Sequence, residues 1–85
     1  MDEILISLYC PSTSRSYDFW MPKRMQVQSV IEQLCDAICE YEKSSNIFKD
    51  RDKLVLCSYM NGRTLSLNLT MEDEQVKTGD RLALV

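Results

Sequence analysis

The first part of the chain alternates between apolar and polar residues with the period of a β-strand. From Ile4 to Cys10 the even-numbered positions are apolar, which predicts a strand with its hydrophobic face on that side. Residues 11–16 have the Pro, Ser and Thr content of a loop. The alternation resumes from Tyr17 to Met21 and stops at Pro22, so we expect an antiparallel hairpin.

The spacing of apolar residues changes to three and four after this hairpin. Between Gln26 and Lys43 the apolar residues recur on one side of a helix, while Glu32, Asp36 and Glu40 cluster on the opposite side. Residues 44–46, Ser-Ser-Asn, favour caps and turns. The pattern therefore predicts one amphipathic helix over residues 26–43.

A second hairpin is predicted after the charged loop at residues 49–53. Leu54 to Tyr59 is a strand-like run, and Asn61-Gly62 is a strong hairpin signal because a type I′ turn needs two positive φ values. We expect Thr64 to Leu69 to form the returning strand and to be short.

The C-terminal part predicts one helical turn and a last strand. Thr70 is suited to cap a turn over Thr70–Glu74, with acidic residues near its positive end. Gly79 lies in a tight turn that leads into a strand from Arg81 to Val85. The elements therefore follow the order strand, strand, helix, strand, strand, short helical turn, strand.

This order is that of an α+β protein with the β-grasp, or ubiquitin-like, fold in a single domain of residues 1–85. It implies a mixed sheet of four to five strands with one main helix across one face. We expect the first hairpin at the centre of the sheet and the last strand parallel to the first. A domain of this size holds one modest core and leaves no volume for a deep enzyme cleft.

Composition narrows the chemistry. The chain has no histidine, which excludes Ser–His–Asp and Cys–His catalysis and any metal site that uses imidazole. Its net charge of −3, without an aromatic stacking platform among the basic loop residues, argues against nucleic-acid binding. We therefore expect a protein that is not an enzyme, takes no cofactor and does not bind nucleic acid.

The chain has four cysteines, and we expect them to be reduced in a cytoplasmic protein. Residues 1–3 are acidic where a signal peptide is basic, and no apolar run is long enough to insert directly into a membrane. Cys35 and Cys39 share a side of the helix, and a zinc site would also need Cys10 and Cys57 to converge on them. We expect small buried thiols, with a cysteine-based metal or redox protein as an alternative.

Three segments resemble one protein family. They are Tyr17–Met21 (YDFWM), Val27–Ile31 (VQSVI) and Val76–Val85 (VKTGDRLALV). Together they resemble the YukD/EsaB family of small bacterial ubiquitin-like proteins associated with type VII (WXG100/ESX-type) secretion. The resemblance implies a non-enzymatic adaptor or regulator whose partners are protein components of the secretion machinery. An interaction domain of a larger protein is the alternative.

The C-terminus bears on conjugation. Ubiquitin-type modifiers and sulfur carriers need a flexible tail that ends in Gly-Gly, because the terminal carboxylate must enter the site of an activating enzyme. Here the sequence stops at Val85, inside the predicted last strand. We expect no conjugation.

Trp20 is the leading candidate for a contact residue. Strand parity places it opposite Phe19 and Met21, on the face that the helix does not cover, together with Leu5 and Tyr9. An exposed indole on a sheet favours burial against a partner or a second copy of the chain. The alternative is a one-residue bulge that turns Trp20 into the core.

The acidic residues of the helix are a second candidate surface. Glu32, Asp36 and Glu40 are four residues apart and form one stripe. The stripe is either a solvated face or a docking surface for a basic segment of a partner.

Overall fold

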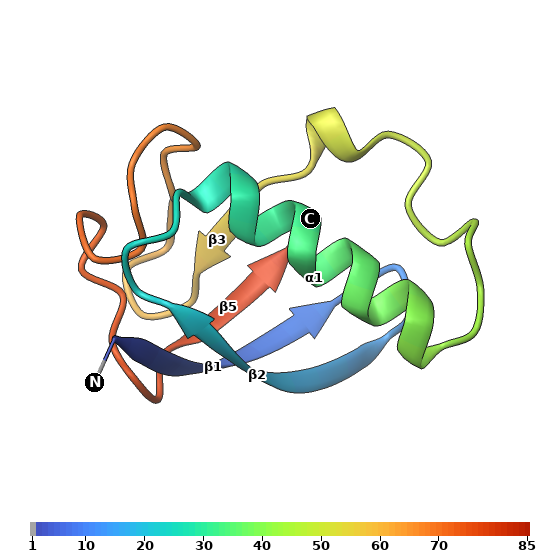
Figure 1. Cartoon of the computed structure of the whole chain (residues 1–85), viewed down its shortest axis with the longest axis horizontal. Helices are drawn as coiled ribbons and strands as arrows, with labels where there is room; N and C mark the ends of the chain where they lie inside the picture. The colour runs from blue at the N-terminus through green and yellow to red at the C-terminus, as the bar shows by residue number, and fades with distance from the viewer. Residues whose placement is uncertain (1) are drawn as a thin grey trace.

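The computed structural model describes residues 2–85, so Met1 of the predicted domain lies outside it. A sheet is covered on one face by a single helix (Figure 1). The elements are β1 (Glu3–Cys10), β2 (Arg15–Pro22), α1 (Val27–Tyr41), the short 3₁₀-helix η1 (Arg51–Lys53), β3 (Leu56–Ser58), β4 (Arg63–Thr64) and β5 (Arg81–Leu84). The α+β β-grasp arrangement is confirmed.

The five strands are arranged in the order β2-β1-β5-β3-β4. β5 is parallel to β1, as predicted, and β3 is antiparallel to β5. The predicted central position of the first hairpin is wrong, because β5 and the second hairpin all add on the β1 side. β2 is therefore an edge strand.

The core lies between the sheet and α1. The even-numbered residues of β1 point at the helix, and Ile6 and Leu8 are fully buried there. From the helix, Val30, Leu34 and Ile38 are fully buried against them. The apolar residues that recur every two positions in the strand and about every 3.6 positions in the helix pack together in this layer.

The helix is anchored at its start by the segment that follows β4. Val27 N–H donates to the Leu69 carbonyl (2.8 Å) and Gln28 N–H to the Leu67 carbonyl (3.1 Å). These bonds satisfy donors that the first turn of a helix leaves free. The helix ends at Tyr41, two residues before the predicted Lys43. Within residues 2–85, no helix is long and apolar enough to cross a membrane.

The second hairpin differs from the prediction. β3 and β4 pair through Cys57–Thr64 and Ser58–Arg63, which leaves a four-residue loop at 59–62. Gly62 has a positive φ of 62°, but Asn61 does not, so the type I′ turn is wrong. Leu65 N–H still donates to the Leu56 carbonyl of β3 (2.8 Å), and the chain then leaves the sheet to reach the start of α1. This shortens the returning strand to two residues.

The segment that starts at Thr70 makes a capped turn, not a helix. Asp73 N–H donates to the Thr70 hydroxyl (2.9 Å), and Thr70 N–H donates to the Asp73 carboxylate (3.2 Å). This reciprocal pair confirms Thr70 as the cap. Gln75, with a φ of 61°, ends the turn after one revolution.

Candidate protein-contact surface

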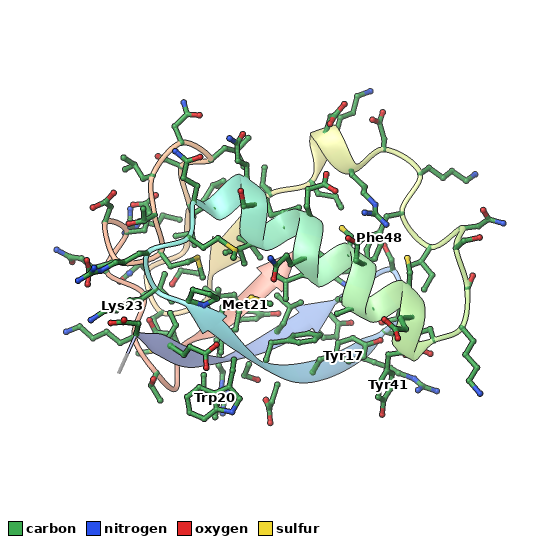
Figure 2. All side chains as sticks on the ribbon, in the orientation of Figure 1. Tyr17, Trp20, Met21, Lys23, Tyr41 and Phe48 are labelled. Atoms are coloured by element: carbon green, nitrogen blue, oxygen red, sulfur yellow. The ribbon has the colours of Figure 1, made fainter. Side chains whose placement is uncertain are left out.

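Trp20 lies on the face of the sheet that the helix leaves bare. The β1–β2 register runs without interruption through the pairs Leu5–Trp20 and Ile4–Met21. Met21 is buried, whereas Trp20 is 56% exposed, and Figure 2 shows its indole directed away from α1. The parity prediction is confirmed, and the inward bulge is wrong.

The other two predicted residues on this face lie apart from each other. Leu5 is the cross-strand neighbour of Trp20 and is half-buried. Tyr9 is four residues further along β1, about 13 Å away for an extended strand, and is 36% exposed. The polar pair Ser7–Asp18 separates them. The bare face therefore carries two apolar patches.

The patch around Tyr9 contains residues that the sequence did not single out. Tyr9, Tyr59, Met60 and Arg81 line one shallow groove, in which Tyr59 and Met60 are 58% and 75% exposed. Tyr59 N–H donates to the Arg81 carbonyl (3.0 Å), so Tyr59 prolongs β3 beyond Ser58. Strand parity over the predicted strand at residues 54–59 could have placed Tyr59, but Met60 lies in a loop without a periodic signal.

The acidic stripe of α1 is divided by a residue from the charged loop. The Arg51 guanidinium lies 2.6 Å from the Asp36 carboxylate and 3.2 Å from that of Glu32. These bonds, chiefly the one to Asp36, raise the pKa of Arg51. Within residues 2–85, no ion pair engages Glu40. Two of the three carboxylates thus hold the 44–55 loop against the helix.

A buried carboxylate that sequence analysis missed secures the segment after β4. Glu74 is 6% exposed. It accepts a hydrogen bond from Arg63 (3.0 Å) and another from the Ser66 backbone N–H. The Ser66 N–H, and then Arg63, hold the pKa of Glu74 below its ordinary value.

Tyr17 joins the end of the helix to the first hairpin. Its hydroxyl donates to the Glu42 carboxylate (2.6 Å) and lies 2.9 Å from the Thr13 hydroxyl. Burial, and then the bond to Glu42, raises the pKa of Tyr17. Its ring packs edge-on against Tyr41, with 5.8 Å between ring centroids, at the place where Figure 2 labels the two residues.

The cysteines are free thiols with different surroundings. Cys10 and Cys35 are buried, and Cys39 and Cys57 are half-buried. Burial raises the pKa of Cys35 to about 11, which keeps it protonated at neutral pH. Among residues 2–85, no three or more His, Cys, Asp or Glu side chains form a group that could hold a metal ion.

Comparisons with known proteins rest on structure alone. No protein-family model and no curated protein matches the sequence. The fold is similar to that of the EccD5 ubiquitin-like domain from Mycobacterium xenopi, at 16% identity over all of this chain and 94% of that one, with a TM-score of 0.77. The ubiquitin-like domain of the Mycobacterium tuberculosis type VII secretion system protein ECCD1 is also similar, at 16% identity over 100% and 99% of the two chains, with a TM-score of 0.72.

A third similar structure is also a ubiquitin-like domain. The N-terminal ubiquitin-like domain of the 4931431F19Rik protein is 19% identical over 99% of this chain and 74% of that one, with a TM-score of 0.71. Identities this low establish the architecture. The chain is a ubiquitin-like protein by fold, with EccD ubiquitin-like domains among its structural neighbours.

Proposed function

We propose that this chain is a non-enzymatic adaptor or regulatory protein of a bacterial type VII secretion system, which acts in the cytoplasm through contact with other proteins. Two observations support the proposal. The fold is similar to EccD ubiquitin-like domains of two mycobacteria. Three segments of the sequence resemble the YukD/EsaB family, which is associated with the same kind of secretion.

The observation that carries the contact role is the exposure of Trp20 on a regular strand. An indole that is 56% exposed leaves a large apolar area in water. Trp is enriched at the centres of protein interfaces, where a few residues supply most of the binding energy. The β1–β2 register fixes the position of Trp20, so a partner meets it with little ordering cost.

Leu5 and Tyr9 extend the proposed surface along β1. Leu5 borders the indole, and Tyr9 joins the second patch with Tyr59 and Met60. We place the partner across both patches, with the Ser7–Asp18 pair between them. In the acidic stripe, no ion pair among residues 2–85 engages the Glu40 carboxylate, so a basic segment can pair with it. Glu32 and Asp36 would first have to release Arg51.

In-cell photo-crosslinking tests this proposal. The photoreactive residue p-benzoylphenylalanine replaces Trp20 in the organism that encodes the chain, and mass spectrometry identifies the crosslinked proteins. A matched control carries the same group at Ser29, an exposed residue of α1. We expect position 20, and not position 29, to capture a type VII secretion component. Capture of a second copy alone at position 20 would replace the adaptor role with a homodimer, and capture only of proteins unrelated to secretion would reject it.

A second candidate is an interaction domain of a larger protein. This candidate is favoured because the two mycobacterial neighbours are ubiquitin-like domains of EccD proteins. An immunoblot of the native organism separates the two candidates, because a domain of a larger protein would migrate well above the 85-residue chain.

A further inference from the structure

The polar strip across the bare sheet face carries opposite charges at its two ends. Ser7 of β1 pairs with Asp18 of β2 on one side and with Arg81 of β5 on the other. Paired residues of neighbouring strands direct their side chains to the same face of a sheet, so all three lie on the face opposite α1. Asp18 and Arg81 are exposed, and no ion pair among residues 2–85 includes either of them.

The neighbouring row of this face has a large side chain on one side of β1 and open space on the other. Leu5 pairs with Trp20 of β2, and on the β5 side its carbonyl accepts a hydrogen bond from the Gly79 N–H (2.8 Å). Gly79 lines the same shallow groove as Arg81. A Cβ added at Gly79 would have no atom of residues 2–85 within 4 Å apart from its chain neighbours. The indole of Trp20 is directed away from α1 (Figure 2), so it is free to enter such a space.

A two-fold axis along β1 brings these complementary positions of two copies together. Rotation about that axis exchanges the β2 and β5 sides of the face, so Asp18 of each copy lies opposite Arg81 of the other. Trp20 of each copy then lies over Gly79 of the other. An axis across the strands through Ser7 would instead set like charges against each other, which is unfavourable. The charges therefore select one arrangement of two copies.

Apolar side chains on and beside this axis supply the area that association buries. Leu5 and Tyr9 lie on β1, so each meets its own counterpart in the second copy. Tyr59 and Met60 flank them in the groove, and they are exposed in the single chain, as are Tyr9 and Trp20. Burial of apolar area is the main driving force of protein association. The strands of the two sheets would be nearly aligned, which is a common arrangement of sheets that pack face to face.

We propose that two copies of the chain associate through their bare sheet faces, with the two-fold axis along β1, Asp18 paired with Arg81 across the interface and Trp20 seated beside Gly79. This dimer needs no role in secretion. It covers Trp20, so a second copy and the partner of the proposed function exclude each other on this face, and only this consequence rests on the proposed function.

Analytical ultracentrifugation of the purified chain tests the proposal. We expect a reversible equilibrium of monomer and dimer in the wild type. Asp18→Arg turns both ion pairs of the dimer into repulsive pairs of cations, so the dissociation constant should rise by about tenfold or more, and Arg81→Asp should act alike through pairs of anions. The matched controls are Asp52→Arg and Lys49→Asp, at exposed residues of the 44–55 loop. They change the net charge by the same amounts and should alter the dissociation constant by less than about twofold.

A mixture of the two charge variants provides the most specific test. A mixed dimer of the Asp18→Arg and Arg81→Asp chains has opposite charges at both pairs again. We therefore expect an equimolar mixture to dimerise at a concentration at which each variant alone is monomeric. Both variants keep a negative net charge, since each changes the wild-type value of −3 by two, so general attraction between the chains cannot cause this rescue. Unchanged circular dichroism verifies that each variant is folded.

Fluorescence of Trp20 shows whether the dimer uses the bare face. The emission should shift to the blue as the wild-type concentration rises through the dissociation constant, because the second copy covers the indole. Four results would overturn the proposal. They are a wild-type chain that stays monomeric up to about 1 mM, equal losses in the control variants, a mixture that stays monomeric, or a dimer that forms without the fluorescence shift. Each of these leaves the proposed role in secretion standing, because crosslinking in cells tests that role separately.

Discussion

The two edges of the sheet are built in opposite ways. β4 is two residues long, and the segment that follows it is fastened by the buried Glu74 carboxylate between Arg63 and Ser66. β2 is eight residues long, and its outward backbone, its indole and the Asp18 carboxylate are all open to water. Figure 1 shows β2 along one border of the sheet, with β3 beyond β5 on the other side.

The difference between the two edges indicates that the β4 edge serves the stability of the fold and the β2 edge serves recognition of other proteins. Proteins commonly protect an edge by making it short or by covering it, because an open strand pairs with other chains. The β4 edge follows that rule, and its charged groups are bonded within the chain. The β2 edge does not, so changes at β4 should unfold the protein while changes on the outer side of β2 should leave the fold intact and affect binding.

The largest effect on stability is expected for Glu74→Ala. It removes the acceptor for the Ser66 N–H and the carboxylate that pairs with Arg63, while Arg63 keeps its hydrogen bond to the backbone carbonyl of residue 74 (2.9 Å). We expect a loss of about 1.5–3 kcal/mol in the free energy of unfolding, the usual contribution of hydrogen bonds to a charged group. Urea titration followed by circular dichroism measures it.

Glu72→Ala is the control for that variant. Glu72 lies in the same segment but is exposed and makes one ion pair, with Lys23 at 3.3 Å. An exposed pair contributes less than about 1 kcal/mol. Equal losses in the two variants would mean that burial of Glu74 has no special role.

The same carboxylate predicts loss of stability in acid. The Ser66 N–H and Arg63 lower the pKa of Glu74 in the folded protein. In the unfolded chain, the pKa of the same side chain is about 4.3. The unfolded state therefore binds the proton first, and stability falls as the pH drops from about 4.3 through the folded pKa. Above that window the contribution is complete.

Glu74→Gln tests the acid effect, because the amide does not titrate. Urea midpoints measured from about pH 7 to about pH 3 should fall less steeply for this variant than for the wild type. Parallel curves would show that other carboxylates cause the acid loss.

Trp20→Ala should have a small effect on stability. Its indole is exposed, so we expect a change of less than about 1 kcal/mol in the free energy of unfolding, compared with roughly 3–5 kcal/mol for a buried Trp. Trp20 is the sole tryptophan of the chain, so fluorescence reports on it directly. Its emission should be that of an indole in water and be quenched by acrylamide, and a blue-shifted, unquenched emission would place it in the core.

The smallest effect is expected for Asp18→Asn. The carboxylate lies outside every ion pair found within residues 2–85, and its side chain is exposed on the outer side of β2. Unfolding in urea should change by no more than about 0.5 kcal/mol. A larger loss would mean that the β2 edge contributes to the stability of the fold, which would contradict the difference between the two edges.

Much of the fold could be predicted because local spacing and tertiary burial agree. The even-numbered residues of β1 and the helix positions at three- and four-residue steps are those that the core buries. The loop at residues 59–62 could not be predicted, since the β3–β4 register depends on pairing with β5 and on the path from Thr64 to the start of α1. The type I′ turn predicted from Asn61-Gly62 rested on local sequence alone, and those tertiary contacts favour a different loop.

The candidate surface was predictable only where it lies on a strand. Parity placed Trp20, Leu5 and Tyr9 on the bare face, but the pairing of Ser7 with Asp18, which divides that face, depends on the β1–β2 register. The ion pairs of Arg51 join residues that are 15 and 19 positions apart, so the division of the acidic stripe was invisible in the sequence.

The most direct test of the central claim is the amount of type VII substrate released into the medium by cells whose only copy of the chain carries Trp20→Ala. The proposed function predicts that this variant accumulates to the wild-type level and alters secretion in the same direction and to a similar extent as deletion of the gene. Wild-type secretion in the Trp20→Ala cells, alongside altered secretion in the deletion strain, would contradict the claim that the exposed indole is the contact through which the protein acts.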